Sequence, residues 1–167
     1  MNTKKQRGFS LIELLIVVAI IGIIAAIAIP NLLKSRQAAN EASAIGSVRT
    51  LGTSQATYQS TRGKGKDFAA DLTALQTDGA IDSALGGGTK SGFVFTCAGT
   101  ASTTAGAPSF FDTSAAPQST GNFGTGNRWF YSNETYVVYQ SSTSAVTVPA
   151  GPGTRVPTAP SDVAPLQ

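Results

Sequence analysis

The 167-residue sequence contains no histidine and a single cysteine, Cys97. Histidine is the usual general base near neutral pH and the commonest metal ligand, so its absence argues against most hydrolases and metalloenzymes. One cysteine allows no intramolecular disulfide, and we expect Cys97 to be a small apolar residue within a strand. The sequence predicts no enzymatic activity, no cofactor and no metal site.

Charge is also scarce, because charged residues make up only 13% of the chain. The net charge of +3 comes from Lys4, Lys5 and Arg7, and the nine basic residues that follow balance nine acidic ones. This excess of positive charge at the start indicates membrane topology rather than nucleic-acid binding. Nucleic acid stays open as a partner, but the aromatic residues are not interleaved with a basic patch.

What the sequence does contain is one long apolar run. Residues 9–29 number 21, and Glu13 is the only charged residue among them. As a helix this run is about 31 Å long, close to the roughly 30 Å hydrocarbon core of a bilayer. A membrane span is therefore the first interpretation, and Glu13 is its anomaly because a charge inside a span typically costs about 2.5 to 3.5 kcal/mol.

Three ordinary segments share some of these features. A secretory signal peptide would find a cleavage site near Ala28, but its apolar region is shorter and has no early carboxylate. A plain single-pass anchor explains the length and the basic flank, yet it leaves Glu13 unexplained. A buried core helix with no polar face would be exceptional in so small a domain.

The junction between the basic and apolar segments resembles the class III signal of type IV pilins and pseudopilins. The resemblance rests on Gly8, Phe9 and Glu13 in the family's spacing and on Pro30 at the end of the run, and it covers about the first 50 residues closely. It implies that a prepilin peptidase cuts between Gly8 and Phe9 and that Phe9 is then N-methylated. The catalytic groups of that reaction belong to the peptidase.

Such a cut would supply the partner that Glu13 needs. It would remove three positive charges and create an ammonium at Phe9, four residues before Glu13, on the same face of a helix. In a filament, the resemblance implies that Glu13 pairs instead with the Phe9 amine of a neighbouring subunit. Either pairing would offset the desolvation of the carboxylate, and removing one partner of a buried pair costs about 3 to 5 kcal/mol. An unpaired carboxylate that snorkels to the interface is the alternative.

Two residues of the run weaken a helix, Gly22 and Pro30. Proline lacks the amide hydrogen and clashes with the preceding turn, so Pro30 predicts a kink or a locally opened stretch. In related filaments the segment between the corresponding glycine and proline can melt. A simple kink where the helix leaves the membrane is the alternative.

The rest of the chain predicts a small α+β domain. Residues 31–61 continue the helix with an amphipathic face that includes Ile45, Val48, Leu51 and Tyr58, and the glycine-rich residues 62–66 end it. Asp67 is expected to cap a short second helix through Leu72 and Leu75. Four acidic residues in this region lack the spacing of a calcium loop, and the glycine-rich residues 86–90 lack that of a phosphate loop.

Short aromatic and β-branched runs follow at residues 93–96, 128–131 and 135–139, the last two as a hairpin. We expect an antiparallel sheet packed on the amphipathic half of the helix, the pilin-like arrangement that the resemblance implies. Residues 100–120, with nine Ser or Thr, and the Pro-rich tail 149–167 have the composition of exposed loops suited to surface display, with glycosylation as one option. Family members often fix the C-terminal loop with a disulfide, which this chain cannot form.

The predicted organisation is a leader (1–8), a transmembrane and filament-core helix (9–30), its amphipathic continuation (31–61), an α+β head (62–148) and a tail (149–167). We expect a prepilin that spans the inner membrane once, with its N terminus cytoplasmic, and then polymerises with identical subunits into a type IV pilus. Its other expected partners are the prepilin peptidase, the inner-membrane assembly machinery and, before assembly, lipid. Two alternatives stay open.

The first alternative is the major pseudopilin of a type II secretion system, in a periplasmic pseudopilus. Such pseudopilins tend to carry a calcium loop near the C terminus, whereas Asp162 is the only acidic residue after Glu134 here. The second alternative, from another class, is a single-pass anchored or secreted binding domain.

Overall fold

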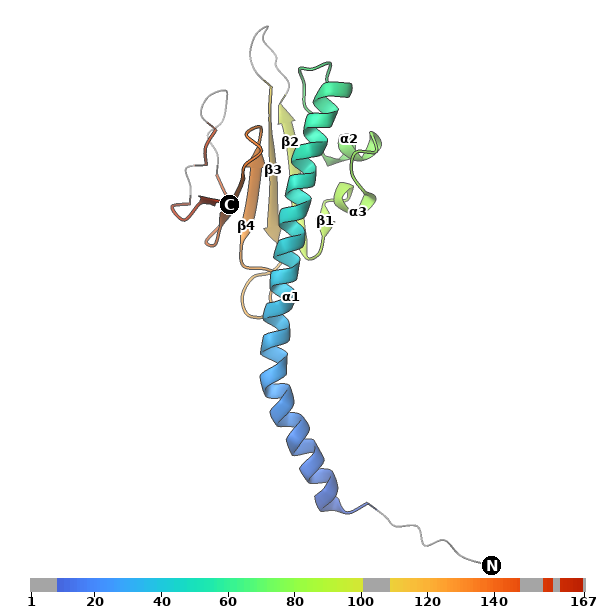
Figure 1. Ribbon diagram of the computed structural model, residues 1–167, viewed down its shortest axis with the longest axis vertical. Helices are drawn as coiled ribbons and strands as arrows, with labels where there is room; N and C mark the ends of the chain where they lie inside the picture. Colours follow the sequence, from blue (N-terminus) through green and yellow to red (C-terminus); the bar gives the residue numbers. More distant parts are fainter. Residues whose placement is uncertain (1–8, 101–108, 148–154, 158–159, 167) are drawn as a thin grey trace, which may run out of the picture.

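A long helical stem carries a head at its C-terminal half in the computed structural model of the chain (Figure 1). The structure describes residues 9–100, 109–147, 155–157 and 160–166. Helix α1, Leu11–Thr61, has 51 residues and runs through both the apolar and the amphipathic segment. The two predicted halves of the helix therefore form one element, which begins two residues later than expected.

Helix α1 ends where the glycine-rich cluster begins. The Arg62 and Gly63 amides both donate to the carbonyl of Tyr58, at 2.8 and 2.9 Å. Lys64 and Gly65 then take positive φ angles of 55° and 73°, which turn the chain away from the helix axis. The predicted end of the helix at residues 62–66 is confirmed.

Pro30 lies inside α1, which is continuous on both sides of it. The stem curves gently below the head (Figure 1), as expected where the proline removes one backbone hydrogen bond. The predicted opening between Gly22 and Pro30 concerns subunits packed in a filament, and it stays a prediction.

Two short helices follow the stem, α2 at Leu72–Thr77 and α3 at Ser83–Gly86. The predicted capping residue is wrong: Asp71, and not Asp67, is the N-cap of α2, and its carboxylate accepts from the Ala74 amide at 2.8 Å. The helix therefore begins later than its apolar stripe suggests. Asp71 precedes α2 directly, and only a residue at that position can reach the free amides of the first turn.

The head contains one six-stranded antiparallel sheet with the strands in sequence order. Its strands are β1 Thr89–Lys90, β2 Phe93–Thr100, β3 Phe110–Pro117, β4 Trp129–Asn133, β5 Val138–Ser141 and β6 Ala164–Pro165. The predicted hairpin is confirmed as β4 and β5, in which Tyr131 stands opposite Tyr139. Its turn falls at residues 134–137, slightly later than predicted.

The expectation that residues 100–120 form an exposed loop is wrong for β3. Eight residues of β3 pair with β2, from Phe110 opposite Thr100 to Pro117 opposite Phe93. The inward positions Phe111, Thr113 and Ala115 are buried. This alternation has the period of a strand, but small polar side chains conceal it in the composition. Residues 101–108 of the predicted loop lie outside the described residues.

The core lies between the sheet and the upper half of α1. Val48 and Leu51 are fully buried there, and Ile45 and Tyr58 pack against the core partly exposed, as the amphipathic pattern predicts. Phe93, Phe95 and Phe130 supply most of the sheet's contribution. The predicted α+β class, a long N-terminal helix packed on a small antiparallel sheet, is confirmed.

Candidate assembly site

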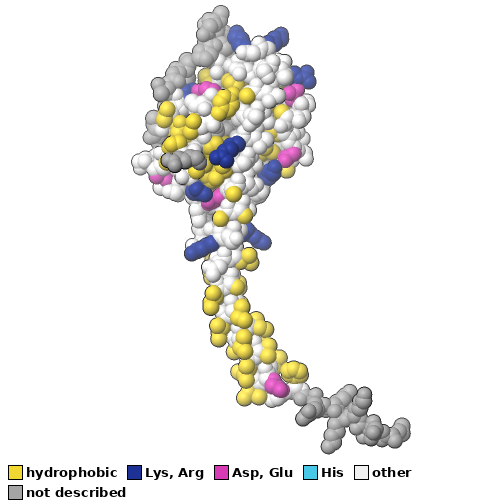
Figure 2. All heavy atoms as spheres, viewed as in Figure 1, with side chains coloured by type: hydrophobic (Ala, Val, Ile, Leu, Met, Phe, Trp, Pro, Cys, Tyr) yellow, Lys and Arg dark blue, Asp and Glu magenta, His cyan; other side chains and the backbone are white. Residues whose placement is uncertain are grey.

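The lower half of α1 exposes its apolar side chains on all sides. Hydrophobic side chains are spread along the stem below the head on the face that Figure 2 shows. Helix α1 is the one helix in the described part of the chain that is long and apolar enough to cross a membrane. More than half of the surface of most of these apolar side chains is exposed, and the values run from 85% at Phe9 to 48% at Val17. Surface of this kind needs lipid or other chains to cover it.

Glu13 sits in the first turn of this stem. Ser10 is the N-cap of α1, and its amide donates to Oε2 of Glu13 at 2.9 Å. Serine followed three residues later by glutamate is the sequence signature of a capping box, a local role for Glu13 that our sequence analysis overlooked. The carboxylate also lies at the helix N-terminus, where the helix dipole favours negative charge.

The structure does not bring Glu13 together with its predicted partner, the Phe9 amine. Phe9 precedes the N-cap, so in the uncut chain it does not occupy the helical position that would place it on one face with Glu13. Gly8 lies outside the described residues, as does the leader 1–8. The cut at Gly8 and the pairing of Glu13 with a Phe9 amine therefore remain predictions.

Gly22 gives the stem an open face. A Cβ placed on Gly22 would meet no atom within 4 Å, so no contact within the chain requires glycine there. A glycine on an exposed apolar helix allows another helix to approach closely. This supports a contact role beside the predicted helix-weakening one.

Polar contacts fix the stem to the head at residues 37–41 of α1. Glu41, 8% exposed, accepts from the Asn127 amide and from Nε of Arg128, each at 2.8 Å. Asn40 Nδ2 donates to the carbonyl of Thr125 at 3.0 Å. Glu41 and Arg128 are 87 residues apart in sequence, so no local sequence pattern predicts this pair.

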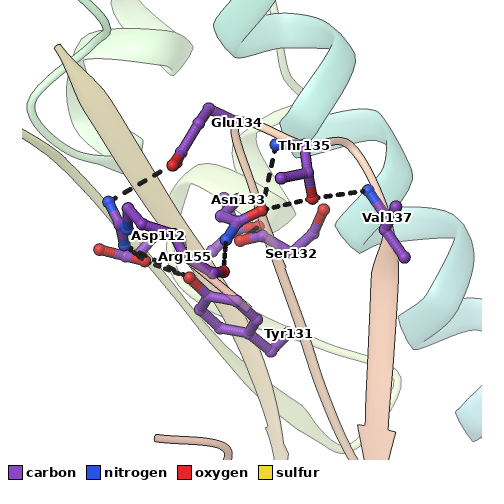
Figure 3. Close-up of polar contacts among 9 residues, drawn as sticks. Asp112, Tyr131, Ser132, Asn133, Glu134, Thr135, Val137 and Arg155 are labelled. Atoms are coloured by element: carbon purple, nitrogen blue, oxygen red, sulfur yellow. Dashed lines mark hydrogen bonds and ion pairs between the residues drawn. The ribbon is translucent and has the colours of Figure 1, made fainter. Parts of the chain in front are cut away.

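A second polar cluster fixes the C-terminal segment to the sheet (Figure 3). Arg155, 4% exposed, contacts Asp112 and Tyr131, and its Nη1 lies 3.5 Å from Oε2 of Glu134. Nδ2 of Asn133 donates to the Arg155 carbonyl at 2.7 Å. We call Asp112, Tyr131, Asn133, Glu134 and Arg155 the Arg155 cluster.

The Arg155 cluster corrects the view of the tail as an exposed segment. Burial and the hydrogen bond to Asp112 raise the pKa of Tyr131, so the phenol stays a neutral donor at ordinary pH. The guanidinium group lies over the ring of Phe110, 4.3 Å from its centroid. Arg155 therefore attaches the described part of the tail to the sheet without the disulfide that the chain cannot form.

Asp162 makes a further attachment of the tail. Its Oδ2 accepts from the Ser142 amide and hydroxyl at 2.6 and 2.7 Å, and its Oδ1 accepts from the Thr143 hydroxyl at 2.8 Å. The hydrogen bonds from Ser142 hold the pKa of Asp162 well below its ordinary range. Strand β6 pairs with β5 beside it.

Cys97 is buried in β2, as predicted. Gln55 of α1, fully buried, donates to Sγ of Cys97 and to the Ala69 carbonyl, both at 2.9 Å. Burial raises the pKa of the Cys97 thiol to about 11, which leaves it protonated and unreactive at neutral pH. The site therefore has a packing role.

The acidic residues between α1 and β1 serve local structure. Asp82 caps α3 and pairs with Lys90 at 2.9 Å, and Asp78 pairs with Arg62 at 2.6 Å. Within the ranges that the structure describes, no three His, Cys, Asp or Glu residues come together as a potential metal site.

Comparison with known proteins agrees with the geometry of the stem. Residues 3–29 match the model of the prokaryotic N-terminal methylation motif. The chain is 46% identical over 68 residues to the type IV major pilin protein PilA of Myxococcus xanthus, covering 41% of this chain and 31% of that protein. It is 60% identical over 38 residues to the type IV wide pilus major component PilA4 of Thermus thermophilus, covering 23% and 29%.

A secretion protein matches over the same kind of stretch. The chain is 39% identical over 49 residues to the type II secretion system core protein G of Escherichia coli, covering 29% of this chain and 34% of that protein. The matched stretch spans about a third of the length of each of these relatives. No solved structure matches the chain significantly. The N-terminal segment of the chain is therefore similar to that of type IV pilins and of type II secretion core proteins.

Proposed function

We propose that this chain is a prepilin, a structural subunit that is cut between Gly8 and Phe9, methylated at Phe9 and polymerised through α1 into a type IV pilus. The observation that carries the proposal is the solvent-exposed apolar stem with one carboxylate, Glu13, in its first turn. Such a surface is stable in lipid before assembly and among the stems of identical subunits after it.

In this proposal, Glu13 sets the axial offset between neighbouring subunits. In the uncut chain, its carboxylate accepts a hydrogen bond from the Ser10 amide. The cut would create a new ammonium at Phe9, within reach of the same carboxylate. In a filament the neighbour's Phe9 amine would approach the same carboxylate, so that one axial offset between subunits satisfies both charges. Between Gly22 and Pro30 the helix would open on packing, and a filament density map with an unbroken helix there would contradict this part.

The proposed route begins in the inner membrane. The chain spans it once with Lys4, Lys5 and Arg7 on the cytoplasmic side, and the head lies on the opposite side. The prepilin peptidase and the inner-membrane assembly machinery are the expected partners. Since the proposed role is structural, the chain needs no catalytic residues of its own.

The second candidate is the major pseudopilin of a type II secretion system, and the match to the core protein G of Escherichia coli supports it. The engagement of Asp162 by Ser142 and Thr143 favours the pilus. The resemblance leads us to expect a calcium loop near the C terminus of a pseudopilin, and here the one acidic side chain of that region is occupied by its own hydroxyl and amide donors.

Mass spectrometry of the mature N terminus is the first test. A methylated Phe9 is the expected result, whereas an intact Met1 would mean a plain anchor and an N terminus at Ile29 a secreted domain. Electron microscopy of cells that lack the gene, combined with an assay of protein secretion, then separates the two assemblies. Loss of surface filaments with normal secretion supports the pilus, and the reverse supports the pseudopilus.

A further inference from the structure

We propose that Phe123 and Lys34 form a seat for an anionic phospholipid of the outer leaflet of the inner membrane, at the level where α1 leaves the bilayer. The inference rests on the proposed membrane-inserted state of the prepilin. It assigns a function to a groove between the stem and the loop that joins β3 to β4, residues 118–128.

The groove has a volume of about 550 Å³. Its walls combine apolar and polar groups, namely Ile29, Pro30, Leu33 and Lys34 of α1 with Asn122 and Phe123 of the loop. Phe123 is 83% exposed, the highest value for any large apolar side chain among the described residues of the head. The groove therefore combines apolar walls with one cationic side chain, that of Lys34.

Hydrogen bonds of the loop backbone hold Phe123 in its exposed position. Nε2 of Gln37, which is nearly buried, donates to the carbonyls of Gly121 and Gly124 at 2.6 and 3.0 Å, on either side of Phe123. The Gly121 amide in turn donates to Oδ1 of Asn127 at 2.8 Å. The backbone that carries Phe123 is thus held against α1 while its ring faces outward, which the packing of the head does not explain.

The length of the stem sets the height of this ring. Residues 9–29 fill the hydrocarbon core at about 1.5 Å per residue, so Ile29 and Pro30 lie at its edge. Lys34 follows Ile29 by five residues, about 7 Å further out, within the layer of lipid headgroups. Aromatic side chains and snorkelling lysines concentrate at this depth in membrane proteins.

Charge favours lipid over a second copy of the chain as the occupant. The stem of a neighbouring subunit would place apolar side chains against Lys34, because its one carboxylate, Glu13, lies at the far end of the 21-residue run. A phospholipid offers a phosphate to Lys34 and the upper parts of its acyl chains to Phe123 and Leu33. One phospholipid can therefore contact both the cationic and the apolar side chains of the groove.

The test uses the full uncut chain in vesicles whose acyl chains are brominated near the headgroup, since bromine quenches nearby tryptophan. The reporter is F123W in a W129F background, which removes the native tryptophan. The matched control is Y136W in the same background, because Tyr136 is half-exposed but packs beside Gly52 of α1, 15 residues and about 22 Å beyond Gln37. An I20W reporter in the same background verifies insertion.

We expect bromine to quench F123W and I20W strongly and to leave Y136W unchanged. Unquenched F123W beside quenched I20W would overturn the seat, as would a blue shift of F123W that grows with the protein-to-lipid ratio, which would assign the groove to a second copy. Unquenched I20W would contradict the proposed function itself. If the chain is methylated and assembles but bromine does not quench F123W, the lipid seat is contradicted and the proposed function stands.

The charge is tested with K34Q, in vesicles of phosphatidylglycerol and of phosphatidylcholine. We expect K34Q to reduce the quenching of F123W in the anionic vesicles and to have no effect in the zwitterionic ones. The matched control R49Q removes an exposed cation higher on α1 and should leave both values unchanged. Equal quenching of F123W with and without K34Q in both lipids would overturn the role of Lys34.

Discussion

The stem and the head handle charge in opposite ways. In the head, Arg155 is almost fully buried and is surrounded by Asp112, Tyr131 and Glu134 from the sheet. In the stem, Glu13 stands alone among 21 residues of the apolar run, and the Ser10 amide is a donor to it. The head pairs its buried charges within one chain, although Nε and Nη1 of Arg155 have no hydrogen-bond partner among the described residues. The stem presents a charge and an apolar surface that other molecules must complete.

This difference separates two kinds of stability. The head depends on contacts distant in sequence, such as Arg155 with Asp112, and those contacts form when the chain folds. The apolar part of the stem depends on local helical hydrogen bonds, because none of its apolar window is buried against the rest of the described chain. Substitutions in the stem should therefore alter assembly and leave the head intact, and substitutions in the head should do the reverse.

The largest expected effect is at Glu13. We expect Glu13→Gln to abolish filament assembly, because glutamine keeps an oxygen that can accept the Ser10 amide but loses the charge that would pair with the Phe9 ammonium. The measurement is electron microscopy of cells, together with thermal unfolding of the purified chain in micelles, which should be unchanged.

A matched stem control is Ile20→Ala, which removes apolar surface at an exposed position without touching charge. It should weaken assembly far less than Glu13→Gln does. Normal filaments with Glu13→Gln would show that the carboxylate acts only as a helix cap and would remove the central argument that it sets the axial offset between subunits.

The next effect in size is at Arg155. Arg155→Met should lower the free energy of unfolding of the head by about 3 kcal/mol, the lower end of the range for breaking a buried pair, because Asp112 retains partial access to solvent. Urea unfolding of the full chain in micelles, followed by Trp129 fluorescence, measures it. Assembly per folded subunit should be unchanged.

Arg62→Met is the matched control for this prediction, since Arg62 pairs with Asp78 at 2.6 Å but is 69% exposed. Surface pairs contribute only about 0 to 1 kcal/mol, so its midpoint should hardly move. Equal destabilisation by the two substitutions would mean that the Arg155 cluster is a surface feature and that the tail is held by other contacts.

A smaller effect is expected from Cys97 at alkaline pH. Burial raises the pKa of its thiol from 9.0 to about 11 in the folded chain, so between those values the unfolded chain releases a proton that the folded chain retains. Stability is unaffected below pH 9 and falls above it, by about 1.4 kcal/mol at pH 10.

The variant Cys97→Ala isolates this contribution. Burial raises the pKa of Tyr131 equally in the wild-type and Cys97→Ala chains, so the contribution of this residue cancels from the comparison. The wild-type chain should lose more stability than Cys97→Ala between pH 8 and pH 10, as measured by urea unfolding. Parallel curves over this range would indicate that the thiol is solvated in the folded head.

The same contrast explains how much the sequence could predict. The stem is local, so periodicity and length were enough to predict α1, its end near Gly63 and the burial of Val48 and Leu51. The hairpin of β4 and β5 was also predictable, because its strands are close in sequence and rich in aromatic residues. Each of these features depends on residues within a few turns or one strand of each other.

The misses in the head come from pairing over long distances. Strand β3 has small polar side chains whose burial follows only from their neighbours in β2 and β4. Arg155 stands in a Pro-rich segment, 43 residues from Asp112, and composition alone indicates an exposed tail. The capping box of Ser10 and Glu13 is different, because its signature is local and present in the sequence. The place of Glu13 within the apolar run points to assembly, and the same side chain also serves the helix end.

The smallest expected effect is at Asp162, and it sharpens the comparison within the head. Asp162→Asn places an amide donor among the Ser142 and Thr143 donors that the carboxylate accepts, so at least one of those hydrogen bonds is lost. Because Asp162 is only partly buried, we expect the unfolding midpoint to stay the same while hydrogen exchange at the Ser142 amide becomes faster. The pKa of Asp162 is lowered, so its carboxylate still accepts these hydrogen bonds at a pH near the ordinary pKa of an aspartate and loses them only in stronger acid. In such acid, the exchange rate of the wild-type chain should approach that of the variant. Unchanged exchange at Ser142 in Asp162→Asn would show that β6 and the Arg155 cluster hold the tail without Asp162.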